Sequence, residues 1–95
     1  MKKTTKNNAK QHLERDIERF AANIDALARE GKRWAAEGDH EMARQNKIDE
    51  CNLRSIYDAV RDGNLNRAAW LTYRLDTIVR DRIPARLFKT IENAI

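Results

Sequence analysis

The stretch LERDIERFAANIDALAREGKRW, residues 13–34, decides the fold of this chain. Its apolar residues recur at alternating steps of three and four, at Leu13, Ile17, Phe20, Ile24, Leu27 and Trp34, with Gly31 in the remaining place. Residues at this spacing share one face of an α-helix, and the sustained pattern is a heptad seam. Because glycine inside a helix costs about 0.5–1 kcal/mol relative to alanine, we expect Gly31 to allow a close helix approach or to mark a kink. The stretch predicts one long helix that packs along one side.

A second helix is predicted from about His40 to Asp62. The segment EGDHE, residues 37–41, separates it from the first helix, with Gly38 as a helix stop and Asp39 as an N-cap. If the two helices fold back on each other at this turn, three apolar pairs meet across the interface: Ile24 with Leu53, Phe20 with Ile56, and Ile17 with Val60. The sequence therefore predicts an antiparallel helical hairpin.

Two polar residues, Asn46 and Asp49, interrupt the apolar face of the second helix. In the predicted hairpin Asn46 lies opposite Gly31, and Asp49 lies near Leu27. Polar residues inside a helical seam often fix the register or the oligomeric state at some cost in stability. We favour that role, and the competing interpretation is a water-filled notch that faces a partner.

A third helix and a short final helix complete the predicted fold. Gly63 and Asn64 form a tight turn, the third helix runs from about Leu65 to Asp81, and Pro84 starts the final helix, whose apolar side is Leu87, Phe88, Ile91 and Ile95. The predicted class is all-α, an antiparallel three-helix bundle made of a long N-terminal helix hairpin plus a third helix, with a short C-terminal helix. Its predicted core consists of Leu13, Ile17, Phe20, Ile24, Leu27, Leu53, Ile56, Val60, Leu71, Leu75 and Ile78.

The positive charge is concentrated at the N-terminus. Four of the 19 basic residues are lysines in the first ten positions, and the other 15 balance the 15 acidic residues of the chain. We therefore interpret residues 1–8 as a flexible basic tail and residues 9–95 as a single helical domain. A neutral body argues against nucleic acid as the main partner, although the tail could also bind phosphates.

No catalytic, metal-binding or cofactor-binding motif is present in the sequence, and we expect a non-enzymatic protein without cofactor or metal. His12 and His40 lie near predicted helix starts and have no second ligand at a suitable spacing. The single cysteine, Cys51, indicates a reducing and hence cytoplasmic setting. No apolar run approaches the length of a membrane span.

The third helix carries the candidate binding residues Arg67, Trp70, Tyr73 and Arg74. Its core stripe is formed by Ala68, Leu71, Leu75 and Ile78, whereas the two rings point away from that stripe. Trp, Tyr and Arg are the residues most enriched at binding hot spots. The alternative is that Trp70 packs beneath the C-terminal helix against Leu87 or Phe88. Trp34, on the seam of the first helix, is expected in the core.

These patterns favour a protein-interaction module, a small regulator or inhibitor that docks on a larger host protein or protein complex. Small helical chains without catalytic motifs are typical of phage and mobile-element accessory proteins, including inhibitors of host defence systems. The alternative is a helix-turn-helix-like nucleic-acid-binding protein that uses the third helix, with Asp62, Asp76 and Asp81 beside its reading face as the argument against it. A homodimer through the first helix is compatible with either function.

Overall fold

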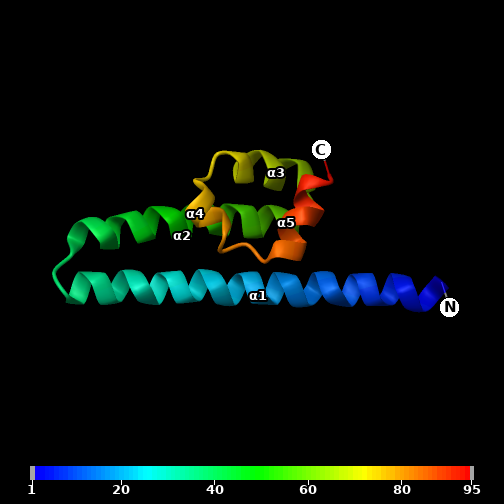
Figure 1. The fold of residues 1–95 in the computed structure, drawn as a ribbon, viewed down its shortest axis with the longest axis horizontal. Coiled ribbons are helices and arrows are strands. Elements are labelled where there is room, and N and C mark those ends of the chain that lie inside the picture. Colours follow the sequence, from blue (N-terminus) through cyan, green and yellow to red (C-terminus); the bar gives the residue numbers. More distant parts are fainter. Residues whose placement is uncertain (1, 95) are drawn as a thin grey trace.

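The computed structural model describes the backbone of residues 2–94 and the side chains of residues 11–94. The regular secondary structure of this part of the chain is entirely helical, and it contains no strand. Its elements are α1 (Lys2–Ala36), α2 (His40–Arg61), α3 (Leu65–Tyr73), α4 (Thr77–Arg80) and α5 (Ala85–Glu92). As predicted, the fold is an all-α helical bundle, in which α2 runs antiparallel to α1 and α3 turns back along α2 (Figure 1).

The first helix is longer than the seam predicts, because its backbone is helical from Lys2 and not from near Ala9. At a rise of about 1.5 Å per residue, its 35 residues span roughly 52 Å. Of the predicted flexible basic tail, residues 1–8, the structure describes the backbone of residues 2–8 alone, so the role of the tail stays a prediction.

The turn between α1 and α2 follows the sequence prediction. Gly38 has a positive φ of 86°, a conformation that glycine adopts readily, and Asp39 caps α2 by accepting a hydrogen bond from the Met42 amide at 3.1 Å. The two helices approach closely at Gly31, where a Cβ atom would lie 3.3 Å from the Cβ of Asn46. The predicted pairing of Gly31 with Asn46 is confirmed, and this close approach explains the glycine.

Polar contacts also join the two long helices. Glu50 is buried on α2 and accepts a hydrogen bond of 3.0 Å from Arg54 Nε, while Arg54 Nη2 lies 3.6 Å from Asp25 of α1. The hydrogen bond to Glu50 is the main cause that raises the pKa of Arg54 above its ordinary value. Arg54 therefore holds a carboxylate on each helix.

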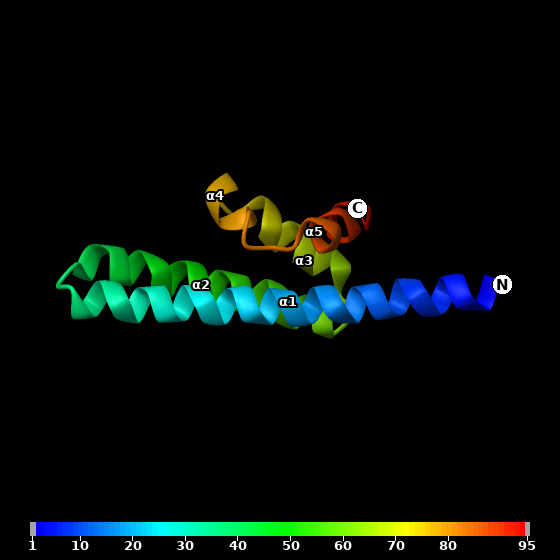
Figure 2. The ribbon, with the colours of Figure 1, turned by 60° about the horizontal axis from the view of Figure 1, so that its bottom comes forward.

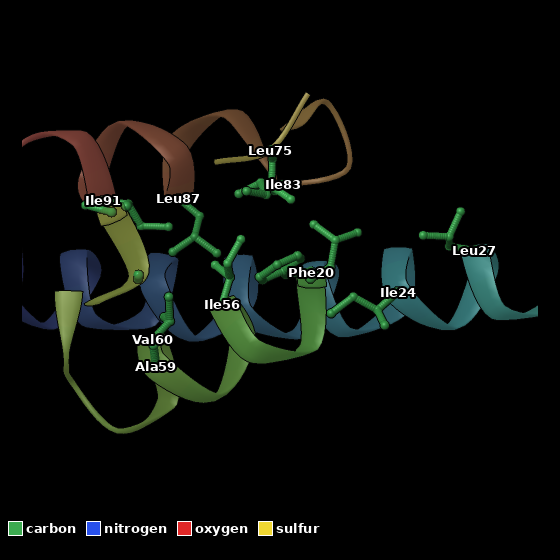
Figure 3. Close-up of a cluster of buried hydrophobic side chains, with 13 residues drawn as sticks. Phe20, Ile24, Leu27, Ile56, Ala59, Val60, Leu75, Ile83, Leu87 and Ile91 are labelled. Carbon is green, nitrogen blue, oxygen red and sulfur yellow. The ribbon is translucent and has the colours of Figure 1, made fainter. Parts of the chain in front are cut away.

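The core lies where α1 and α2 meet the C-terminal half of the chain. Figure 3 shows Phe20 and Ile56 pointing toward each other, with Ile83 and Leu87 above them. Of the predicted core, six residues are buried on the hairpin (Phe20, Ile24, Leu27, Leu53, Ile56 and Val60), Leu75 is buried beyond α3, and Leu13, Ile17 and Leu71 are partly buried against them. The prediction for Ile78 is wrong, because its side chain is 83 % exposed.

The predicted third helix, Leu65 to Asp81, is wrong beyond Tyr73. The chain leaves the helix after α3, Asp76 is extended with ψ 150°, and α4 follows as a single turn. Arg80 stabilises this break by donating from Nε to the Leu75 carbonyl at 3.1 Å and from Nη2 to the Tyr73 carbonyl at 3.0 Å. These bonds satisfy carbonyls that lose their partners where the helix ends.

The C-terminal segment belongs to the main core. Leu87 and Ile91 of α5 are fully buried, and Ile83 in the loop before Pro84 is buried as well. Ile95 lies outside the described residues. Polar contacts tie this segment to α1: Asn23 Nδ2 donates to the Arg82 carbonyl at 2.8 Å, and Arg82 Nη2 lies 2.8 Å from Glu30. Arg86 adds a longer ion pair of 3.9 Å to Asp16.

The molecule is a rod of 56 × 22 × 20 Å. Figures 1 and 2 show why: α3, α4 and α5 cover the middle of the α1–α2 hairpin, while the turn end of the hairpin projects beyond them. Only the single turn of α4 lies beside the part of the hairpin that contains Leu27, Trp34, Met42 and Asn46, so no described helix covers this part over its full length.

Candidate functional site

Helix α3 holds the candidate binding residues in place through its buried side. Its N-terminus is capped by Asn64, whose side chain accepts a hydrogen bond of 3.1 Å from the Arg67 amide. Ala68 and Ala69 are buried, and buried Thr72 donates from Oγ1 to the Ala68 carbonyl at 2.7 Å. Since the buried residues are small, α3 packs closely on α2, and its opposite side remains open to solvent.

The opposite side of α3 brings together Arg67, Trp70, Tyr73 and Arg74, a surface that we call the aromatic–arginine face. Trp70 is 57 % exposed and Tyr73 is 58 % exposed. The guanidinium carbon of Arg74 lies 4.8 Å from the centre of the Trp70 ring, within the range of a cation–π interaction. Neither arginine forms an ion pair with any residue in 11–94. The alternative position of Trp70, packed beneath the C-terminal helix, is wrong.

A small hollow borders the aromatic–arginine face on the side of α2. It has a volume of about 260 Å³ and is lined by Asn52, Ser55, Leu71, Arg74 and Leu75. The amide of Asn52 and the hydroxyl of Ser55 add neutral hydrogen-bonding groups beside the Arg74 guanidinium. Arg74 thus lies between an aromatic ring and a polar recess.

A larger groove lies between the hairpin and α4, on residues outside the predicted binding site. It has a volume of about 480 Å³, and its apolar walls are Leu27 and Trp34 of α1, Met42 of α2, and Ile78 and Val79 of α4. We call it the hairpin groove. Trp34 is half-buried here and takes no part in the main core, so its predicted core position is wrong. The polar interruption at Asn46 and Asp49, both of which line the groove, was the available sequence signal.

Asn46 places a buried polar atom, without a hydrogen-bond partner in the described residues, between α1 and α2. Its side chain is only 7 % exposed, and Nδ2 is buried without a hydrogen-bond partner within the described residues. A buried donor without a partner costs about 1–3 kcal/mol relative to a paired one. Asn46 therefore weakens the hairpin where the two helices approach closely at Gly31.

We expect Asn46→Leu to raise the thermal midpoint, because leucine has a similar size and removes the unpaired donor. A gain of about 1 kcal/mol would correspond to roughly 4–8 °C in a domain of this size. Thermal unfolding followed by circular dichroism measures the change, and Gln45→Leu, at an exposed neighbouring position, should not reproduce it. A lower midpoint for Asn46→Leu would show that the amide is satisfied and stabilising.

The histidines, the cysteine and the acidic side chains of the described residues form no further candidate site. His12, His40 and Cys51 are exposed, and no three His, Cys, Asp or Glu side chains of residues 11–94 gather as a potential metal site. Within the part of the chain that the structure covers, no helix is both long enough and apolar enough to span a bilayer.

Comparison of the chain with protein-family models, with curated proteins and with solved structures finds no match.

Proposed function

We propose that this protein is a non-enzymatic interaction module that docks the aromatic–arginine face onto an acidic surface of a larger protein. One observation carries the proposal: two large rings on one side of α3 are each more than half exposed, and a guanidinium lies over one of them. A ring in water adds little to folding, whereas Trp and Tyr buried at the centre of an interface can each contribute 2 kcal/mol or more.

The chemistry of the face supports a partner with an acidic surface. The cation–π contact holds the Arg74 guanidinium over the Trp70 ring, and its N–H groups remain available to a carboxylate. Arg67, one turn before Trp70, supplies a second cation without an ion-pair partner among residues 11–94. Two arginines beside two rings suit a partner patch in which Asp or Glu side chains surround an apolar recess.

The proposed role is that of a small cytoplasmic regulator or inhibitor, of the kind found among phage and mobile-element accessory proteins that block host defence systems. A single helical domain of 95 residues supports this by analogy of size and composition. Docking on a larger host protein or complex would itself produce the effect, because the bound module covers a surface that the host protein uses.

Capture of partners from a host-cell lysate, with and without nuclease, tests the proposal. We expect a protein partner that survives nuclease treatment. Loss of all captured material on nuclease treatment would support the helix-turn-helix-like alternative, in which α3 reads nucleic acid.

We expect Trp70→Ala and Arg74→Ala to weaken binding to the captured partner at least tenfold while the melting curve stays close to that of the wild type. The physical reason is that both side chains are exposed in the free protein and would be buried only in the complex. Titration calorimetry and circular dichroism provide the two measurements. Arg44→Ala is the matched control, because Arg44 is exposed on α2 and outside the face. Equal losses in all three variants would overturn the assignment of the face.

A further inference from the structure

The hairpin groove lies where a third helix would pack against α1 and α2 if α3 were longer. Along the middle of the hairpin, the core residues Phe20 and Ile56 are covered by the C-terminal half of the chain. Toward the turn end the seam of α1 continues through Leu27 and Trp34, but α3 stops at Tyr73 and does not reach it (Figure 1). Apolar side chains therefore line a groove that the chain leaves open.

The dimensions of the groove fit a short helix. From Leu27 to Trp34 the floor extends seven residues along α1, or about 10 Å. Its volume of about 480 Å³ lies in the range of roughly 300–1,000 Å³ that is typical of binding clefts. A helix of two to three turns with large apolar residues at i, i+3 or i+4, and i+7 would fill the space between two antiparallel helices. Ile78, 83 % exposed on α4, forms the outer wall.

The charges around the groove select a basic occupant. Its lining contains the carboxylates of Glu30, Asp49 and Asp76 and one cation, Arg82. Arg82 is already paired with Glu30, and neither Asp49 nor Asp76 has a cationic partner in residues 11–94. Even if Arg33 is added, whose guanidinium carbon lies 5.9 Å from the centre of the Trp34 ring but which does not line the groove, the acids outnumber the cations by three to two. The groove is therefore negative although the whole chain carries +4.

We propose that the hairpin groove binds a basic amphipathic helix of a partner protein, with its apolar side against Trp34, Met42 and Ile78 and its lysines or arginines near Asp49 and Asp76. The chain's own basic segment does not supply this occupant, because residues 2–10 contain no large apolar side chain. The site is separate from the aromatic–arginine face and opposite to it in charge.

The test uses a synthetic 15-residue helical peptide with leucines on one side and lysines on the other, and a counterpart in which every lysine is glutamate. The protein carries Trp70→Phe, so that Trp34 is its only tryptophan and reports from inside the groove. Fluorescence titration should show a blue shift of Trp34 emission and at least tenfold tighter binding of the lysine peptide. The net charge of the protein alone would favour the glutamate peptide, so non-specific attraction gives the opposite result.

Two variant pairs locate the binding. Ile78→Ser should weaken binding of the lysine peptide at least tenfold, whereas Ile48→Ser, at an exposed isoleucine of α2 outside the groove, should leave it unchanged. Asp76→Asn should weaken binding severalfold. Asp58→Asn should not, because Asp58 is exposed near the C-terminal end of α2, away from the groove. Neither Ile78 nor Asp76 contributes a buried side chain, so both variants are expected to fold.

Preference for the glutamate peptide, an unchanged Trp34 emission, or equal losses with Ile78→Ser and Ile48→Ser would each overturn the proposal. So would sedimentation equilibrium showing that the chain alone is a dimer that Ile78→Ser dissociates, because the groove would then be filled by a second copy. The peptide measurement does not use the aromatic–arginine face, so failure of either proposal leaves the other standing.

Discussion

Phe20→Ala is expected to lower the free energy of unfolding by about 3–5 kcal/mol, a large part of the 5–15 kcal/mol typical of a whole domain. The ring of Phe20 is completely buried, and it contacts Tyr57 of α2 edge-on with ring centres 6.0 Å apart. Because it lies at the centre of the core cluster, alanine would leave a cavity bordered by several elements that cannot all close around it.

Urea unfolding followed by circular dichroism measures this loss as a lower midpoint at an unchanged slope. The matched control is Ile17→Ala, one turn earlier on the same side of α1 but only partly buried, for which a clearly smaller loss is expected. A Phe20→Ala protein as stable as the wild type would contradict the central place given to this ring.

Leu87→Ala is expected to cost about 2–5 kcal/mol, which is as severe as a substitution in either long helix. Leu87 is fully buried, although it belongs to a helix of eight residues near the end of the chain. Since Leu87 and Ile91 hold α5 against the bundle, the variant should also expose the amides of α5 to faster hydrogen exchange.

Ile78→Ala is the control for Leu87→Ala. The sequence pattern places Ile78 in the core, whereas the structure leaves it 83 % exposed, so we expect a change within about 0.5 kcal/mol. A large loss at Ile78, or none at Leu87, would contradict the way in which the structure divides the core between α4 and α5. Chemical denaturation of both variants under the same conditions decides between these results.

The long hairpin could be predicted from the sequence because its determinants are local. Helical periodicity places Phe20, Ile24 and Leu27 on one side of the helix. Gly38 permits a turn that needs a positive φ, which few residues other than glycine adopt. Once the turn is known, the rise per residue fixes which positions meet, and the pairing of Gly31 with Asn46 follows.

The end of α3 could not be predicted in this way. Leu71, Leu75 and Ile78 continue the helical spacing, so periodicity alone extends the helix to Asp81. The chain instead breaks at Asp76, an N-cap type of residue, and Arg80 stabilises the break through contacts with the Tyr73 and Leu75 carbonyls. Such a side-chain contact competes with the helix and has no periodic signature.

The aromatic–arginine face could be predicted from local sequence, whereas the hairpin groove could not. The exposure of Trp70 and Tyr73 follows from their phase relative to Ala68, which is a local property of α3. The hairpin groove depends on where α4 lies relative to α1 and α2, and only Asn46 and Asp49 hinted at it as polar residues on an apolar side. The heptad seam predicts Trp34 in the core, because the sequence does not show that α3 ends too early to cover it.

The rod shape of the molecule changes how it moves through a column or a solution. Its radius of gyration is 14.9 Å, whereas a compact domain of 95 residues would have about 12.4 Å. An elongated monomer diffuses more slowly than a sphere of equal mass, so gel filtration calibrated with globular standards will return an apparent mass well above 11.1 kDa. An early elution peak is therefore the expected behaviour of a single copy, and light scattering or sedimentation equilibrium gives the true mass.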